Sequence, residues 1–275
     1  MVAVVTDSAA NVPADLQSEL GIAVAPLALR LGERTFRDGV DMVGGDFYER
    51  LATDKEPAST SAPSPGEYLD AYEQARDAEL VCVTLASGMS VSHENAVLAA
   101  EHFAGRVVVV DSRSATIGEG FVALEAARTA RAGFSLQQAA SRARTVASAV
   151  RVIGAIETFE FLQRSGRVGK LQAYAATKLD IKPVFRLEGG EIKPVGRPRT
   201  RGKALTRIVE DVVREIGGRP VHLGAFHARA EDAAGELLER IGAECDVAER
   251  FVVEASPAIG AHTGPGLVGV AFFCD

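Results

Sequence analysis

The sequence predicts an α/β fold in two domains, an N-terminal parallel, doubly wound sheet followed by a mixed α+β domain. Three short apolar runs, at 2–5, 80–85 and 106–110, are each followed by small polar residues and then by a helical pattern. A strand, a polar turn and a helix in repetition indicate a parallel sheet whose functional site lies at the carboxyl ends of the strands. Beyond residue 149 a hairpin pattern is mixed with helices, which indicates the second domain.

Local signals predict the elements of the first domain, residues 1–149. Asn11 is expected to cap a helix that has Pro13 in its first turn. The segment 53–66 carries Pro and Gly residues around Thr60 and Ser61 and is expected to be an ordered functional loop. The expected elements are, in order, a strand at 2–5, a helix at 11–20, a strand region at 22–31, a helix at 46–51, a strand at 80–85, a helix after Ser92, a strand at 106–110, and two helices that begin near 118 and 136.

The second domain, residues 150–275, is expected to combine a hairpin with amphipathic helices. Glu188-Gly189-Gly190 separates the two arms of the hairpin. The expected elements are, in order, a strand at 150–156, a helix at 157–166, hairpin arms at 180–187 and 191–195, a helix at 203–216, a strand at 221–226, a helix at 231–241 and a strand at 267–273.

The composition is that of a globular protein, because 47% of the 275 residues are hydrophobic and 24% are charged. The net charge of −7 argues against a dedicated nucleic-acid-binding protein. Three scattered cysteines, at 82, 245 and 274, give neither a disulfide framework nor a zinc motif. The N-terminus has no signal-peptide pattern and no apolar run approaches the length of a membrane span. A cytoplasmic protein is therefore expected.

Small polar residues gather at four predicted turns or strand ends. Each cluster is also typical of ordinary turn and cap chemistry, because Ser and Thr cap helices and Gly adopts positive φ. The four clusters are 60–61, 90–92, 197–200 and 260–266.

Ser90 lies in a segment that is similar to the nucleophile elbow of α/β-hydrolases. The sequence GMSVS follows a buried strand and precedes a helix, but it ends in Ser92 where the elbow has Gly. Ser90 and His262, with Asp7 or Asp111, would complete a catalytic triad, so a serine hydrolase or esterase is the alternative function. Because the motif is broken, binding of an anion at this helix N-terminus is favoured over nucleophilic catalysis.

The other patterns exclude several classes of site. The segment 118–123 matches G-x-G-x-x-A but does not directly follow a strand, so no dinucleotide site is expected. The five histidines form no metal-binding pattern, so no metal or cofactor is expected. The basic segment 197–207 lacks interleaved aromatic residues, which favours a solvated surface with one Arg available to an anion. His262, in the glycine-rich turn 260–266, is expected to be positioned for proton chemistry or for pairing with an anion.

Taken together, these segments resemble the DegV family of bacterial fatty-acid-binding proteins. The resemblance implies two domains with a fatty acid buried in a tunnel between them and its carboxylate held at the interface. It runs over nearly the whole chain and is carried by VVTDSAANVP, TSAPSPGEY, MSVSHENA, VVVVDSRSATIGEG, FLQRSGRVGKL, LDIKPVFRLEGGEIKPVGRPRTRGKAL and GAHTGPGLVGVAF.

The resemblance also implies which residues hold the carboxylate. Thr60 and Ser90 match the family's carboxylate-binding hydroxyls, and Val91 stands where the family has a Gly whose backbone amide contributes. His262 and Arg199 match the cationic side of the site. The chain departs from the family in reading MSVSHENA for LSGTYQSA and TSAPS for TSQPS.

The role implied by the resemblance is that of a binding subunit without catalysis of its own. Such a subunit presents a long-chain fatty acid to a separate fatty acid kinase subunit, which phosphorylates the carboxylate to an acyl-phosphate. Burial of the acyl chain at about 0.8 kcal/mol per CH₂ would supply most of the affinity. The expected partners are the fatty acid and the kinase, with transient membrane contact and no nucleic acid.

Overall fold

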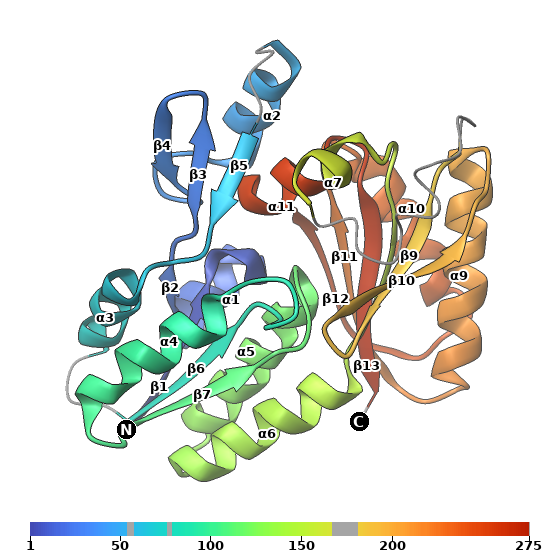
Figure 1. Cartoon of the computed structure of the whole chain (residues 1–275). Coiled ribbons are helices and arrows are strands. Elements are labelled where there is room, and N and C mark those ends of the chain that lie inside the picture. The colour runs from blue at the N-terminus through green and yellow to red at the C-terminus, as the bar shows by residue number, and fades with distance from the viewer. Residues whose placement is uncertain (54–57, 76–78, 167–180, 275) are drawn as a thin grey trace.

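The structure is a computed structural model that describes residues 1–53, 58–75, 79–166 and 181–274. Helices and sheets alternate in layers across the molecule (Figure 1). A four-stranded sheet and a six-stranded sheet each carry helices on both faces, and one pair of helices lies between the two sheets. The helices of these layers are α3 (Pro65–Gln74) and α4 (Ser92–Ala100), then α5 (Ile117–Arg131) and α6 (Leu136–Ala149) between the sheets, then α9 (Arg201–Ile216) and α10 (Glu231–Gly242).

The four-stranded sheet is parallel throughout, with strand order β2-β1-β6-β7. Its central strands are apolar on both faces: Val81 and Val83 pack toward α5 and α6, whereas Leu80 and Cys82 pack toward α3 and α4. Continuous apolar runs are typical of parallel strands that are covered on both sides. The strands are β1 (Val2–Asp7), β2 (Ala23–Ala25), β6 (Glu79–Thr84) and β7 (Val107–Asp111).

The six-stranded sheet is mixed, with strand order β10-β9-β8-β13-β11-β12. Only the β11–β12 pair is parallel among its described ladders. Gly189 and Gly190 have φ of 61° and 84° and form the two-residue turn between β9 and β10. The strands are β8 (Arg151–Ala155), β9 (Val184–Glu188), β10 (Glu191–Gly196), β11 (Val221–His227), β12 (Val247–Glu254) and β13 (Val268–Cys274).

A small antiparallel sheet, β4-β3-β5, stands beside the carboxyl end of the four-stranded sheet (Figure 1). Two short helices, α7 and α11, pack against each other at the strand ends of the six-stranded sheet that lie nearest the small sheet (Figure 1). These remaining elements are η1 (Ser8–Ala10), α1 (Ala14–Leu20), β3 (Ala28–Leu31), β4 (Arg34–Arg37), α2 (Gly44–Thr53), β5 (Ala58–Ser61), η2 (Glu101–Phe103), α7 (Glu160–Arg164) and α11 (Pro257–Thr263).

Helix α5 is buried on all sides over its first three turns, because it lies between the two sheets. Its glycines permit this close packing. A Cβ at Gly118 would lie 2.7 Å from a Val152 methyl, and one at Gly120 would lie 2.6 Å from the Ala10 carbonyl oxygen. The glycines of the G-x-G-x-x-A pattern are therefore explained by the close packing of β8 and η1 against α5.

The predicted fold class is confirmed, since a parallel sheet covered on both faces is followed by a mixed sheet. The domain boundary between residues 149 and 150 stays a prediction. The predicted motif FLQRSGRVGKL and the start of the hairpin arm at 180 fall partly on 167–180, outside the described residues.

Three local predictions were wrong. The expected loop at 53–66 contains β5, which pairs with β3. His262 was expected in a glycine-rich loop turn, but it lies near the end of helix α11, which begins at Pro257 and includes Gly260. Asn11 does not cap α1; it ends η1 in the left-handed conformation, with φ of 47°, and Pro13 precedes the helix.

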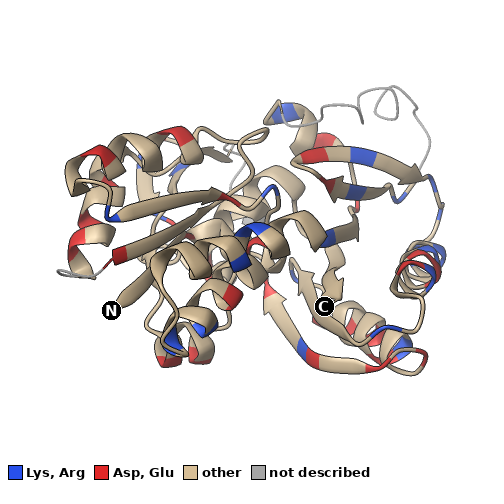
Figure 2. Cartoon of the chain, turned by 90° about the horizontal axis from the view of Figure 1, so that it is seen from below, with Lys and Arg blue, Asp and Glu red and all other residues tan. Residues whose placement is uncertain are grey.

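Charged positions lie mainly on outer helices and loops (Figure 2). Along α9 both signs are interspersed, with Arg207 and Arg214 each hydrogen bonded to Asp211. Such mixed charge gives no single-sign stripe for a nucleic-acid backbone. Among the described helices, none has both the length and the apolar character required to cross a membrane.

Candidate ligand-binding site

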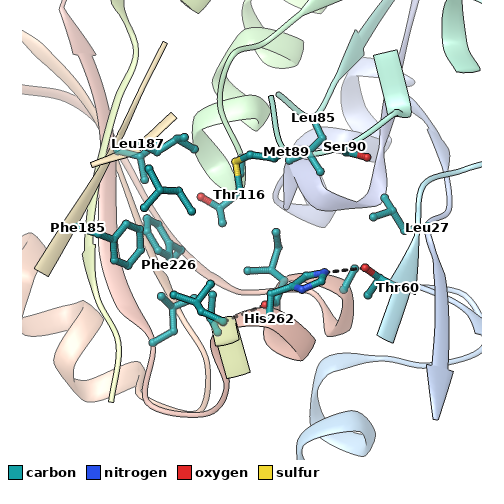
Figure 3. Close-up of a pocket in the computed structure, with 18 of the residues that line it drawn as sticks. Leu27, Thr60, Leu85, Met89, Ser90, Thr116, Phe185, Leu187, Phe226 and His262 are labelled. Carbon is teal, nitrogen blue, oxygen red and sulfur yellow. Dashed lines mark hydrogen bonds between the residues drawn. The ribbon is translucent and has the colours of Figure 1, made fainter. Parts of the chain in front are cut away.

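A cavity lies where the carboxyl end of the four-stranded sheet meets the small sheet and the six-stranded sheet (Figure 3). No Asp, Glu, Lys or Arg is found among its described lining residues. Five lining residues have a polar side chain, and they are Thr60, Ser90, Thr116, His262 and Thr263. The site is therefore suited to a ligand that is mostly apolar and carries a few hydrogen-bonding atoms.

One end of the cavity is polar and is built by three distant segments. Thr60 on β5 and His262 on α11 are 202 residues apart, yet Thr60 Oγ1 lies 2.7 Å from His262 Nε2. Ser90 lies on the loop between β6 and α4 and lines the same cavity. All three side chains are half-buried, so this end is reachable from solvent. Of the five predicted site residues, the fold brings these three together (Figure 3).

Ser90 is held by the start of helix α4. Its Oγ lies 2.8 Å from Ser92 Oγ and accepts a hydrogen bond from the Ser92 N–H. Val91 is the N-cap residue of α4; its side chain is 54% exposed, and no acceptor for its backbone N–H occurs in the described part of the chain. A hydroxyl and an open N–H at a helix N-terminus are typical donors to an anion.

The loop that carries Ser90 is fixed at both sides. At its start, the Leu85 N–H donates to the buried Asp7 carboxylate at 2.9 Å. In its middle, Gly88 lies against the turn of the β9–β10 hairpin, where a Cβ would come within 2.9 Å of the Gly190 carbonyl oxygen. The Gly190 N–H in turn donates to the Arg113 carbonyl oxygen. The hairpin thus closes over the loop and ties the two sheets together beside the cavity.

The other end of the cavity is apolar and well buried. Its side chains come from the six-stranded sheet, from α7 and from the residue directly before β13, and each is 9% exposed or less. In Figure 3, the rings of Phe185 and Phe226 and the side chain of Leu187 lie on the side opposite Thr60. The residues of this end are Leu162, Phe185, Leu187, Phe226 and Leu267. An apolar chain placed here would be removed from water.

Asp38 positions the helix that carries His262. Its carboxylate is 1% exposed, accepts the Ser8 hydroxyl at 2.6 Å and accepts the Ala258 N–H in the first turn of α11 at 3.1 Å. Burial raises the pKa of this carboxyl group to about 6. The hydrogen bonds from Ser8 and Ala258 stabilise the charged form and lower the pKa, but their effect is smaller than that of burial. The nearby Asp7 carboxylate also raises the pKa of Asp38, by repulsion.

Asp38→Asn is expected to remove a pH dependence of stability. The pKa of Asp38 is about 6 in the folded protein, against 3.8 for an ordinary aspartate exposed to water, so the folded state binds this proton more tightly. The contribution of Asp38 is therefore fully present below about pH 4 and falls by about 2–3 kcal/mol as pH rises through about 6. An Asn stays neutral and keeps an oxygen for the Ala258 N–H.

Urea unfolding at about pH 4 and about pH 7.5 tests this, with the free energy of unfolding compared between variant and parent. Asp41→Asn is the matched control, because Arg37 holds the pKa of the exposed Asp41 carboxyl at about 2, below this range. If Asp38→Asn retains the parent's pH dependence, Asp38 is not the group responsible.

Arg199 is not brought to the cavity. It is exposed and is not among the described lining residues. The reason is local: Thr200 caps α9 by accepting the Lys203 N–H, which leaves residue 199 outside the helix and directed to solvent. Arg201 instead contacts Glu157, with 3.3 Å between Nη2 and Oε2. The resemblance to the family did not predict this placement.

The predicted hydrolase pair is not assembled. The Ser90 hydroxyl is paired with Ser92, whereas the Nε2 atom of His262 is paired with Thr60. No Asp or Glu lines the cavity among the described residues to orient the imidazole. The arrangement of donors around Thr60, Ser90 and the Val91 N–H is instead suited to holding a carboxylate.

Asp38 and Thr116 are two functional residues of the site that no motif in the sequence marks individually. Thr116 appeared only inside the motif VVVVDSRSATIGEG, and Asp38 lies in the exposed-looking segment RDGVD. No spacing rule marks an aspartate that will be buried by a helix 220 residues further along the chain. For Thr116, its place directly before a helix was the available signal.

A family model, curated relatives and solved structures all match this chain over all or nearly all of its length, and all of them carry the name DegV. The family described as "Uncharacterised protein, DegV family" matches residues 1–275. A DegV domain-containing protein of Streptomyces coelicolor is 35% identical over 273 residues, which is 98% of this chain and 97% of that protein. A DegV family protein of Thermus thermophilus, whose structure is described as fatty acid binding, is 30% identical with a TM-score of 0.94, covering 100% of this chain and 99% of its own. DegV of Bacillus subtilis, described as a fatty acid binding protein, is 28% identical with a TM-score of 0.88, at coverages of 100% and 99%.

Proposed function

The chain belongs to the DegV family, and on this premise we propose that it binds a long-chain fatty acid and presents the carboxylate to a separate kinase subunit. The observation that carries the proposal is the cavity itself, with a half-buried polar end and a buried apolar end. The fatty-acid binding described for the proteins of Thermus thermophilus and Bacillus subtilis supports the same ligand class.

We assign the carboxylate to the polar end. Thr60, Ser90 and the Val91 N–H supply donors there, and His262 contributes its ring nitrogen beside Thr60. A carboxylate taken from water needs several such donors, because burial of an unpaired charge is costly. Arg199 is exposed, so we assign it no contact with the head group. Residues 167–180, which include further basic side chains, are outside the described chain.

The acyl chain would extend toward Phe185, Leu187 and Phe226. Each CH₂ buried there contributes about 0.8 kcal/mol, so the chain supplies most of the affinity and the polar end supplies orientation. Half-buried head-group residues leave the carboxylate open to a kinase active site. We propose that the acyl-phosphate forms on that partner, in the cytoplasm, and that this chain supplies no catalytic group.

Native mass spectrometry of the protein purified from cells tests the ligand, followed by organic extraction and lipid analysis. We expect one bound fatty acid per chain. If the delipidated protein also fails to bind added palmitate, the proposal is wrong and ester hydrolysis becomes the next activity to measure. The kinase step is tested by adding ATP and a bacterial fatty acid kinase catalytic subunit and trapping acyl-phosphate with hydroxylamine. Hydroxamate is expected only when both proteins are present.

Ser90→Ala is expected to weaken palmitate binding by about 10-fold, because a hydrogen bond to a charged acceptor, worth at least about 1.5 kcal/mol, is lost. Ser87→Ala is a matched control on the same loop, since the Ser87 hydroxyl donates to Asp111 and does not line the cavity. Titration of the delipidated proteins with palmitate measures both. An ester hydrolysis activity in the parent that Ser90→Ala abolishes would reverse the assignment in favour of the hydrolase.

A further inference from the structure

Thr116 presents a buried hydroxyl to the cavity at a place the head-group site does not use. The residue is 5% exposed, lines the cavity, and has no hydrogen-bond partner for Oγ1 in the described part of the chain. In Figure 3 its hydroxyl points toward the side that holds Leu187, Phe185 and Phe226, away from Thr60 and His262. One polar atom therefore faces the otherwise apolar part of the cavity.

The position of Thr116 makes this orientation unusual. It is the N-cap residue of α5, where a threonine side chain ordinarily accepts a hydrogen bond from the first turn. Here its side chain makes no cap hydrogen bond, and its backbone carbonyl accepts the Glu119 and Gly120 N–H groups instead. The hydroxyl is thus directed into the cavity rather than used by the helix.

The backbone at Thr116 is also strained. Its φ is 54° and its ψ is −150°, a region that a β-branched residue rarely adopts and that glycine adopts without strain. Strained residues are found chiefly where the surrounding structure serves a ligand or a reaction. The unmade hydrogen bond of the buried hydroxyl and the strain of the backbone each destabilise the folded protein. A hydrogen bond from the hydroxyl to the bound ligand would offset this destabilisation.

We propose that Thr116 is a specificity-determining residue that hydrogen bonds to a hydroxyl group carried part-way along the acyl chain of the bound fatty acid. This inference rests on the proposed fatty-acid function and deepens it, because it names hydroxylated acyl chains as the favoured substrate class. A site with a buried partner for a substrate hydroxyl discriminates strongly between ligands that carry it and ligands that lack it.

The test is a titration of delipidated protein with palmitate and with 2-hydroxy-, 3-hydroxy- and 10-hydroxyhexadecanoate. Three variants are compared with the parent. Thr116→Val removes the hydroxyl at constant shape, and Thr116→Ser restores it. Thr263→Val is the matched control, because Thr263 also lines the cavity but its hydroxyl already donates to the Ile259 carbonyl oxygen at 3.0 Å.

We expect Thr116→Val to weaken binding of at least one hydroxy acid by about 10-fold while palmitate binding changes less than about 2-fold. Thr116→Ser should restore most of that affinity, and Thr263→Val should show no such selectivity. The melting temperature of Thr116→Val should not fall, since an unpaired hydroxyl is removed. Equal effects of Thr116→Val on palmitate and on every hydroxy acid would overturn the inference while leaving the fatty-acid function intact. Failure of the parent to bind any of the four acids would instead reject the proposed function.

Discussion

Gly269→Ala is expected to lower the free energy of unfolding by at least about 3 kcal/mol, which corresponds to a fall in melting temperature of about 6–12 °C. Gly269 lies in β13, where it pairs with Gly154 of β8 on one side and with Phe226 of β11 on the other. A Cβ at Gly269 would lie 2.4 Å from Phe226 Cζ and 2.5 Å from the Ile153 carbonyl oxygen. The backbone contact leaves the new methyl group no position to move into.

The same substitution is expected to affect the cavity. Phe226 lines its apolar end, and the two facing glycines of β8 and β13 give its ring the space it occupies. A methyl group at position 269 displaces the ring, so palmitate affinity should fall together with stability. Thermal unfolding and palmitate titration of the purified variant measure the two effects separately.

Gly235→Ala is the matched control for the loss of a glycine. Gly235 lies within α10, and a Cβ there would meet nothing within 4 Å. Alanine in a helix is favoured over glycine by about 0.5–1 kcal/mol, so this variant should be slightly more stable than the parent. A Gly269→Ala protein as stable as the parent would contradict the packing account.

A double variant separates the two contacts of the new methyl group. In Gly269→Ala/Phe226→Leu the far end of the ring is gone, whereas the Ile153 carbonyl oxygen remains. The double variant should therefore be more stable than the sum of the two single losses predicts, but less stable than Phe226→Leu alone. Strict additivity would show that the ring contact has no part in the destabilisation.

The alternation of strands and helices could be predicted because parallel strands covered on both faces leave continuous apolar runs, as at 80–85. Edge elements were harder to predict. Strand β12 alternates between half-buried and exposed residues along its whole length. Since none of its residues is fully buried, its sequence lacks the apolar run that marks the central strands. Helix α11 was interpreted as a turn, because Gly260 within it is a residue that helices usually exclude.

The candidate site likewise has residues that could be predicted from the sequence and residues that could not. Nothing local connects Thr60, Ser90 and His262, and their grouping followed from the resemblance to the family rather than from any spacing in the chain. Arg199 was carried over by the same resemblance, yet the cap of α9 directs it to solvent. Thr116 and Asp38 depend on burial by segments distant in sequence, and such burial leaves no local signal.

Thr60→Val is expected to weaken fatty-acid binding by about 10–100-fold, because a hydrogen bond to a charged acceptor contributes about 1.5–3 kcal/mol. The effect should exceed that of Ser90→Ala, since Thr60 contacts His262 directly and the substitution removes this contact from the imidazole as well. Valine keeps the β-branched shape on β5, so the pairing of Thr60 with Leu29 of β3 is expected to remain. Isothermal titration of the delipidated variant with palmitate measures the loss.

Thr35→Val is the control for this substitution, because Thr35 is exposed on β4 of the same small sheet and is not among the described residues that line the cavity. Its palmitate affinity should equal that of the parent. A Thr60→Val protein that binds palmitate as tightly as the parent would remove Thr60 from the head-group site.

Ligands of different chain length distinguish an effect of Thr60→Val on the polar end of the cavity from an effect on its apolar end. If Thr60 acts only on the carboxylate, Thr60→Val reduces the affinity for myristate and for stearate by the same factor, since the CH₂ groups are buried elsewhere. A fatty alcohol of equal length has no carboxylate, so its affinity should change less than about 3-fold. A loss that grows with chain length would mean instead that Thr60→Val disturbs the apolar end. The position of the head group would then have to be assigned through Ser90 and the Val91 N–H alone.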